Sequence, residues 1–252
     1  MKKRYSGLFA LILYAVLWVG GLLSSVLWDQ VPDNTAWAAP VFLYLASILI
    51  LIYSGTRPAL LLFAVGVYGF VIEVIGSASG FPFGDYEYTK TLGPALFDVP
   101  LALASAWIVV TAFTLFLLNV IKLDRRWWFL IGPLLMVTVD LLIEPVAAGP
   151  MNAWHWASSG EYYGVPVTNF FGWFLVSIPI FTIYSVVGSN PNRGSLISSS
   201  VIVFFIALSA INLLWWPILI TLVAIAMLAL PHLKKLFAEE SADDADSTSL
   251  EI

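Results

Sequence analysis

Residues 129–148 read FLIGPLLMVTVDLLIEPVAA, which is typical of a membrane-spanning helix apart from two carboxylic acids, Asp140 and Glu144. A second stretch, residues 60–78, reads LLLFAVGVYGFVIEVIGSA and carries Glu73 in the same way. An acid at membrane depth costs several kcal/mol, so it is rare there, faces the interior of a helix bundle and marks a functional site. These two stretches therefore predict a membrane fold and the place of its chemistry.

The composition of the whole chain supports this interpretation. Its 252 residues are 60% hydrophobic and 11% charged, and the mean hydropathy is +0.92. A water-soluble core cannot bury that much apolar surface, so we expect an all-α protein, a polytopic bundle of transmembrane helices. Cysteine is absent, which excludes disulfides and thiolate metal sites, and the basic residues form no patch that would favour nucleic acid.

Eight stretches are apolar and long enough to cross a bilayer, which needs roughly twenty residues per helix. The apolar tract 196–230 would be about 50 Å long as one straight helix, so it must turn back. We place the turn at NLLWWP, residues 212–217, which supplies a polar residue, two interfacial tryptophans and a helix-breaking proline. The predicted spans are 7–28, 37–54, 58–77, 95–120, 127–147, 165–187, 196–211 and 214–231.

Charge placement tests this count, because Lys and Arg collect on the cytoplasmic side of membrane helices. With the N-terminus inside, every Lys and Arg except Lys90 falls in an inner segment. A seven-helix fold would instead place Lys234 and Lys235 outside. We therefore expect a multi-pass protein of the cell membrane with eight transmembrane helices and both termini cytoplasmic. Residues 1–235 would form a single transmembrane helical domain, and residues 236–252 an acidic, disordered cytoplasmic tail.

Helix rise places the three acids in one layer of the membrane. Each lies roughly 20 to 25 Å along its helix from the inner end, in the outer half. Asp98 and Asn169 begin inward-going helices from that same side, although Asp98 also fits a simple helix-dipole role. Asp140 and Glu144 are four residues apart and share a helix face, where two like charges disfavour each other. One of the two is expected to keep its proton near neutral pH, which suits a general acid.

Two long connections, residues 76–94 and 147–169, lie on the same outer side and are dense in Gly, Pro and aromatic residues. Loops elaborated at one end of a rigid scaffold commonly carry function. Their rings suit a flat unsaturated ligand or a cationic intermediate, although for any single ring a lipid-headgroup belt is the simpler explanation. The belt does not explain so much Gly and Pro beside the acids. The candidate substrate-binding residues are Phe83, Tyr86, Tyr88, Asp98, Trp154, Trp156, Tyr162, Tyr163, Asn169 and Trp173.

Three blocks of the sequence resemble a known family. They read EVIGSASGFPFGDYEYTKTLGPALFDVPL at 73–101, DLLIEPVA at 140–147 and WHWASSGEYYGVPVTNFFGW at 154–173. They resemble the carotenoid biosynthesis membrane proteins of the CruF type, the carotenoid 1,2-hydratases of bacteria and the bisanhydrobacterioruberin hydratases of haloarchaea. The positions that match the family pattern are Glu73, Pro82, Phe83, Gly84, Tyr86, Tyr88, Gly93, Pro94, Pro100, Asp140, Glu144, Pro145, Trp154, Trp156, Gly160, Tyr162, Gly164, Pro166, Asn169 and Gly172.

The resemblance implies addition of water across the terminal C1=C2 double bond of a linear (ψ) carotenoid end group, giving a tertiary alcohol without a redox cofactor. The substrate would be of the bisanhydrobacterioruberin type or of the γ-carotene or lycopene type. Such chemistry needs an acid for the less substituted carbon, an electron-rich wall for the tertiary cation, and one positioned water. Asp140 or Glu144 is our candidate proton donor and Glu73 the partner that orients the water, with the order among the three left open.

Two other functions also place acids in membrane helices. A proton-coupled transporter is one, but here the acids stay in the outer half and no comparable polar pathway reaches the inner face. A membrane carotenoid cyclase of the lycopene type is the other, since it too protonates a terminal alkene and differs chiefly in excluding water. The polar loops above the acids favour hydration.

An iron oxygenase is set aside because non-haem iron sites use several imidazoles. The predicted topology puts His155 and His232, the only histidines, on opposite membrane faces, and His155 fits an interface residue slightly better than a contact in the site. We therefore expect no metal and no cofactor. The expected partners are a membrane-dissolved carotenoid, water, the lipid bilayer and other enzymes of carotenoid biosynthesis, and not nucleic acid.

Overall fold

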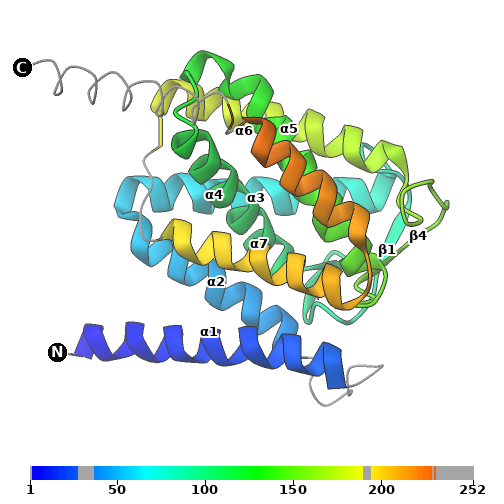
Figure 1. Cartoon of the computed structure of the whole chain (residues 1–252), viewed down its shortest axis with the longest axis horizontal. Helices are drawn as coiled ribbons and strands as arrows, with labels where there is room; N and C mark the ends of the chain where they lie inside the picture. The colour runs from blue at the N-terminus through cyan, green and yellow to red at the C-terminus, as the bar shows by residue number, and fades with distance from the viewer. Residues whose placement is uncertain (1, 28–36, 190–193, 229, 231–252) are drawn as a thin grey trace, which may run out of the picture.

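The computed structural model describes residues 2–27, 37–189, 194–228 and 230, and eight α-helices lie in these residues (Figure 1). The helices are α1 Lys2–Leu27, α2 Ala38–Ser54, α3 Thr56–Ser79, α4 Ala102–Val120, α5 Trp128–Ala148, α6 Val167–Val187, α7 Gly194–Ile211 and a last helix, Trp215–Leu228. The predicted all-α class is confirmed. Six of the helices, α1 and α3 to α7, are long and apolar enough to cross a membrane, which indicates a multi-pass membrane protein.

The predicted turn in the last apolar tract is confirmed. α7 ends at Ile211, and the next helix begins at Trp215. The amides of Asn212, Leu213 and Leu214 donate to backbone carbonyls of the last turns of α7, which satisfies acceptors that a helix end leaves free. The other part of this prediction, the cationic Lys234 and Lys235 with the acidic tail 236–252, lies outside the described residues, as does His232.

One predicted span, 95–120, begins too early. Ala95–Leu96 (β2) and Val99–Pro100 (β3) form a short antiparallel hairpin, and α4 begins only at Ala102. The hairpin turns at Phe97 and Asp98, which both have positive φ (54° and 60°). Positive φ at both central residues is what a two-residue type I′ hairpin turn requires. The segment is apolar enough to suggest a helix, but Pro94, directly before it, and Pro100, within it, cannot donate the amide hydrogen bonds of a helix. Asp98 therefore does not begin a helix.

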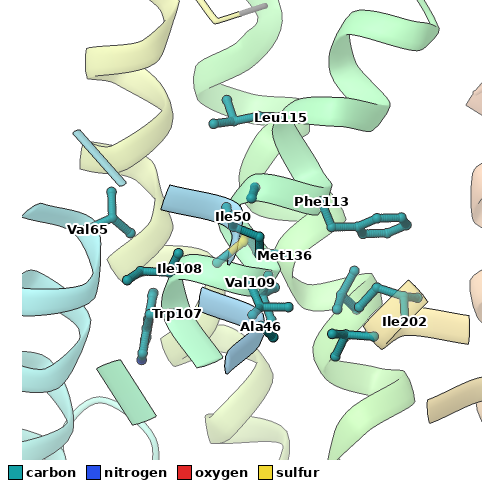
Figure 2. Close-up of a cluster of buried hydrophobic side chains, with 14 of the residues drawn as sticks. Ala46, Ile50, Val65, Trp107, Ile108, Val109, Phe113, Leu115, Met136 and Ile202 are labelled. Carbon is teal, nitrogen blue, oxygen red and sulfur yellow. The ribbon is translucent and has the colours of Figure 1, made fainter. Parts of the chain in front are cut away.

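α4 is the central helix of the bundle and packs against α2, α3, α5 and α7. Figure 2 shows its side chains Trp107, Ile108 and Val109 meeting residues of the surrounding helices. Because lipid tails are as apolar as leucine, contacts of this kind stabilise the fold through close van der Waals packing. The labelled partners of α4 in this cluster are Ala46 and Ile50 of α2, Val65 of α3, Met136 of α5 and Ile202 of α7.

Two long connections meet at one end of the bundle. Tyr86–Tyr88 (β1) pairs antiparallel with Trp154–Trp156 (β4), so that Tyr86 lies opposite Trp156 and Tyr88 opposite Trp154. Figure 1 shows this pair at the right-hand end, with the α2–α3 turn at the opposite end. Successive side chains of a strand point to opposite faces, and accordingly Glu87 and His155, the middle residues, are exposed while their neighbours are not. The inner face of the pair therefore presents four aromatic rings to the helices.

Candidate active site

The three membrane acids line one small cavity beneath the β1–β4 pair. Glu73 projects from α3, and Asp140 and Glu144 project from α5 one helical turn apart; their exposed fractions are only 5%, 4% and 4%. The cavity has a volume of about 60 Å³, which is room for about four water molecules. Seven aromatic residues also line it: Phe83, Tyr86, Tyr88, Trp107, Trp154, Trp156 and Trp173.

Glu73 accepts three hydrogen bonds. The hydroxyls of Tyr86 and Tyr88 donate to Oε2 at 2.8 and 2.7 Å, and the indole Nε1 of Trp107 donates to Oε1 at 3.1 Å. Hydrogen bonds to a carboxylate are roughly twice as strong as neutral ones, so three donors hold this side chain firmly. The arrangement suits a carboxylate that is charged and fixed in place.

The tyrosine donors keep their protons. Burial raises the pKa of both Tyr86 and Tyr88, and the negative charge of Glu73 raises the pKa of each further. Both residues lie in the connection after α3, outside the membrane-spanning helices. The two phenols therefore remain hydrogen-bond donors to Glu73 across the physiological pH range.

Glu144 and Asp140 have fewer donors than Glu73. The indole nitrogens of Trp154 and Trp156 both donate to Oε2 of Glu144 at 3.2 Å, and the amide of Asn169 donates to Oδ2 of Asp140 at 2.8 Å. The second oxygen of each acid, Oε1 or Oδ1, receives no hydrogen bond from the described residues. Those two oxygens are therefore free to carry a proton or to bind a ligand.

The aromatic wall is tightly packed around Trp107 and Trp173. Their rings stack with centroids 4.4 Å apart and planes only 13° from parallel, which joins α4 to α6. Trp107 can lie this close to α3 because Gly69, one turn before Glu73, has no side chain; a Cβ there would overlap the indole ring. The same contact carries the indole N–H to Glu73. A glycine in α3 therefore positions one of the three donors to the acid.

Tyr162 and Tyr163 do not line the cavity, although the sequence made them candidates. Tyr162 donates its hydroxyl to the carbonyl of Leu141 at 2.9 Å. That carbonyl would normally accept from the amide of residue 145, but position 145 is a proline and has no N–H. Tyr162 thus supplies the hydrogen bond that Pro145 cannot, and it ties the second loop to α5. Tyr163 is 41% exposed.

The remaining candidate residues fall into two groups, those that line the cavity and those that do not. The structure brings Phe83, Tyr86, Tyr88, Trp154, Trp156, Asn169 and Trp173 together with the three acids at the cavity. Asp98 is exposed at the tip of the β2–β3 hairpin and does not line it. His155 lies on the outer face of β4, exposed, as expected for an interface residue.

The sequence interpretation missed Trp107. It lies within an apolar span, and nothing in the span itself distinguishes a core tryptophan from a hydrogen-bond donor. The available signal is in α3, where Gly69 precedes Glu73 by one turn and leaves room for a large ring beside the acid.

In the described residues, no group of three His, Cys, Asp or Glu side chains lies close enough together to hold a metal ion. The three acids line the cavity without converging on one point.

These features define a class: a polytopic membrane protein with a buried acid cavity under a lid of aromatic loops. A family profile described as carotenoid biosynthesis protein matches residues 36–230, and the chain belongs to this family, which confirms the resemblance seen in the sequence. It is also 34% identical over 127 residues to a bisanhydrobacterioruberin hydratase of Haloarcula japonica. That alignment covers 47% of this chain and 42% of the relative, so the match spans less than half of the curated protein. No solved structure matches the chain.

Proposed function

We propose that this protein is a carotenoid hydratase, which adds water to the terminal C1=C2 double bond of a linear carotenoid end group and yields a tertiary alcohol. The observation that carries the proposal is the acid cavity: three buried carboxyl groups around room for a few waters, enclosed by seven aromatic side chains. The family membership and the hydratase name of the Haloarcula japonica relative agree with this chemistry.

The proton donor in this mechanism is Asp140 or Glu144. Each has one oxygen that receives no hydrogen bond from the described residues, and the two acids share one face of α5, so their charges disfavour each other. The neutral acid transfers its proton to C2, the less substituted carbon of the alkene. The π electrons form the new C2–H bond, and C1 becomes a tertiary cation.

The cation is then captured by water. The aromatic faces around the cavity stabilise positive charge at C1, by about 0.5 to 2 kcal/mol for each well-placed ring. Glu73, held by its three donors, accepts a hydrogen bond from the water and directs its oxygen to C1. The C1–O bond forms, the water proton passes to a carboxylate of the cavity, and proton exchange among the acids through cavity water restores the starting state.

We also propose a membrane arrangement for this chemistry. All eight helices cross the cell membrane with both termini cytoplasmic, and the acid cavity lies near the outer face. The alternation of Lys and Arg along the chain supports this orientation. Leu103, Ala106, Val110 and Ile143 give the cavity an apolar side, which suits a polyene entering from the bilayer.

The test is to express the chain in cells that accumulate lycopene, and separately in cells that accumulate bisanhydrobacterioruberin, and to measure products by mass spectrometry. We expect a product heavier by the mass of water. A cyclase would give a product of unchanged mass, and a transporter no new product. In deuterated water, each hydrated end group should carry one deuterium on C2, the carbon next to the C1 that bears the new hydroxyl.

The amide variants Glu73→Gln, Asp140→Asn and Glu144→Gln test the assigned acids. Losing an acid or base of this kind lowers the rate by about 10²- to 10⁴-fold. Glu87→Gln is the matched control, because Glu87 lies between Tyr86 and Tyr88 on β1 but points away from the cavity and is exposed. Full hydration by all three amide variants, at wild-type protein levels, would disprove the mechanism.

A further inference from the structure

A second, larger cavity lies at the end of the bundle opposite to the acids. Its volume is about 240 Å³. On α3 it is lined by Leu62, which precedes Glu73 by eleven residues, about 16 Å along the helix. On α6 it is lined by Tyr184, eleven residues after Trp173 of the acid cavity. The two cavities are therefore separate sites on the same helices.

Two arginines line this second cavity without a counter-charge. Arg57 begins α3, and Arg125 lies in the short 3-10 helix η2 (Arg125–Trp127) before α5. Neither guanidinium forms an ion pair with the described residues, and no acid is among the residues that line the cavity. The neighbouring Arg126 differs, because it lies outside the cavity and pairs with Asp124 at 3.2 Å.

Arg125 is an exposed residue whose guanidinium packs against Trp128 and Gly188. It lies 6.0 Å from the centroid of the Trp128 ring, and it fills the space in front of Gly188, where a Cβ would overlap the guanidinium. Gly188 has a φ of +72°, so glycine is favoured there by its backbone conformation as well. The residue that follows α6 therefore leaves room for this guanidinium.

Tyr184 supplies an independent observation. Its side chain lines the cavity and is only 3% exposed, yet its hydroxyl has no hydrogen-bond partner in the described part of the chain. A buried hydroxyl without a partner is costly and rare in native structures. A ligand that accepts a hydrogen bond at this position would remove that cost.

We propose that this second cavity binds the phosphate of an anionic membrane lipid. Guanidinium groups match phosphate oxygens in geometry and charge, and the Tyr184 hydroxyl is a further donor. The apolar side of the cavity, formed by Leu61, Leu62, Leu115 and Phe116, suits the start of an acyl chain. Arginines near a membrane surface commonly contact lipid headgroups; the cavity and the unpaired buried hydroxyl distinguish this site from such a surface contact. The proposal does not depend on the hydratase reaction.

The test uses the full-length protein in detergent, with phosphatidylglycerol or phosphatidylcholine added, and counts bound lipids by native mass spectrometry. We expect phosphatidylglycerol to bind in preference to phosphatidylcholine and to raise the melting temperature. Inorganic phosphate and diphosphate form a second arm: stabilisation by these ions assigns the phosphate site to a soluble ligand, and stabilisation by the lipid alone assigns it to the membrane.

Variants link the effect to the cavity. The double variant Arg57→Gln, Arg125→Gln should weaken phosphatidylglycerol binding by about tenfold or more, and Tyr184→Phe by about threefold. Arg126→Gln removes the same charge one residue away and should bind as the wild type does. Lysine at positions 57 and 125, which keeps the charge, should restore part of the binding. Equal loss in Arg126→Gln and the double variant, or no preference for phosphatidylglycerol, overturns the proposal.

Discussion

The two ends of this helix bundle hold cavities of opposite character. At one end the charged groups are acids, and hydrogen-bond donors from the chain hold each of them: two tyrosines and a tryptophan on Glu73, two tryptophans on Glu144 and Asn169 on Asp140. At the other end the charged groups are arginines, and no described residue forms an ion pair with Arg57 or Arg125.

The two ends differ in whether the protein itself supplies the partners of its charged and polar groups. The acid cavity is small, aromatic and supported by several elements, which is the arrangement expected where groups must be fixed before a reaction begins. The arginine cavity is larger and leaves a buried hydroxyl unpaired, which is the arrangement expected where a ligand supplies the missing partners. The predictions below test whether the two ends act independently and whether the donors at the acid end have the roles assigned to them.

Among variants outside the three acids, the largest effect is expected from Gly69→Ala. The added methyl group would overlap the Trp107 ring and move its indole N–H away from Glu73. Small displacements at a reacting centre cost about 100-fold in rate, and overpacking costs about 1–3 kcal/mol of stability. Hydration rate and melting temperature should both fall, while phosphatidylglycerol binding at the opposite end persists.

The control for Gly69→Ala is Gly20→Ala. Gly20 lies on α1, and a Cβ there would meet no atom within 4 Å. Alanine is the better helix former, so this variant should be neutral or slightly more stable. Equal behaviour of the two variants would show that close packing at Gly69 has no role in the site.

A smaller effect is expected when single donors to Glu73 are removed. Tyr86→Phe and Tyr88→Phe each delete one hydrogen bond to the carboxylate and keep the ring. Trp107→Phe deletes the third hydrogen bond but also removes one of the two fused rings, so this variant should lose stability as well. A bond to a charged acceptor contributes about 1.5–3 kcal/mol, so kcat should fall about tenfold or more with little change in KM.

Tyr53→Phe is the matched control for these donor variants, since Tyr53 lies on α2 and lines neither cavity. If the three donor variants hydrated the substrate as fast as Tyr53→Phe, catalysis would not depend on the hydrogen bonds to Glu73. The contrast between the two cavities would then say nothing about the reaction.

The smallest effect on catalysis is expected from Tyr162→Phe. This change leaves the carbonyl of Leu141 unpaired, because Pro145 cannot supply an amide hydrogen. An unsatisfied acceptor costs about 1–3 kcal/mol when it is fully buried and less at this part-buried carbonyl, so the melting temperature should fall slightly. The rate per folded molecule should fall less than in Tyr88→Phe; a larger fall would place Tyr162 in the reaction itself.

The helices and the common level of the three acids along the bundle could be predicted because each depends on local properties. Apolar length identifies the spans, and helix rise places Glu73, Asp140 and Glu144 at a common depth. The hairpin at 95–100 could not be found this way, since an apolar strand pair and the start of an apolar helix have the same composition. Around that segment Pro94 and Pro100, and not the hydropathy, indicate that the chain is not helical.

Other features depend on contacts between distant segments. The sequence shows YEY at 86–88 and WHW at 154–156 but does not say that they pair. The role of Trp107 depends on Gly69 of another helix, and the second cavity is lined jointly by Arg57, Arg125 and Tyr184 from three different segments. Such partners become visible only when the packing of the helices is known.

The pairing of β1 with β4 also makes the lid intolerant of insertion. Because strand side chains alternate, a slip of one residue along either strand would turn its aromatic donors outward and bring Glu87 or His155 inward. Three residue pairs form the ladder, and backbone hydrogen bonds from Thr89 to Ala153 and from Ala157 to Asp85 continue it in the same register. We therefore expect that the lengths of these two loops, and not only the residues in them, constrain how the protein can change over evolution.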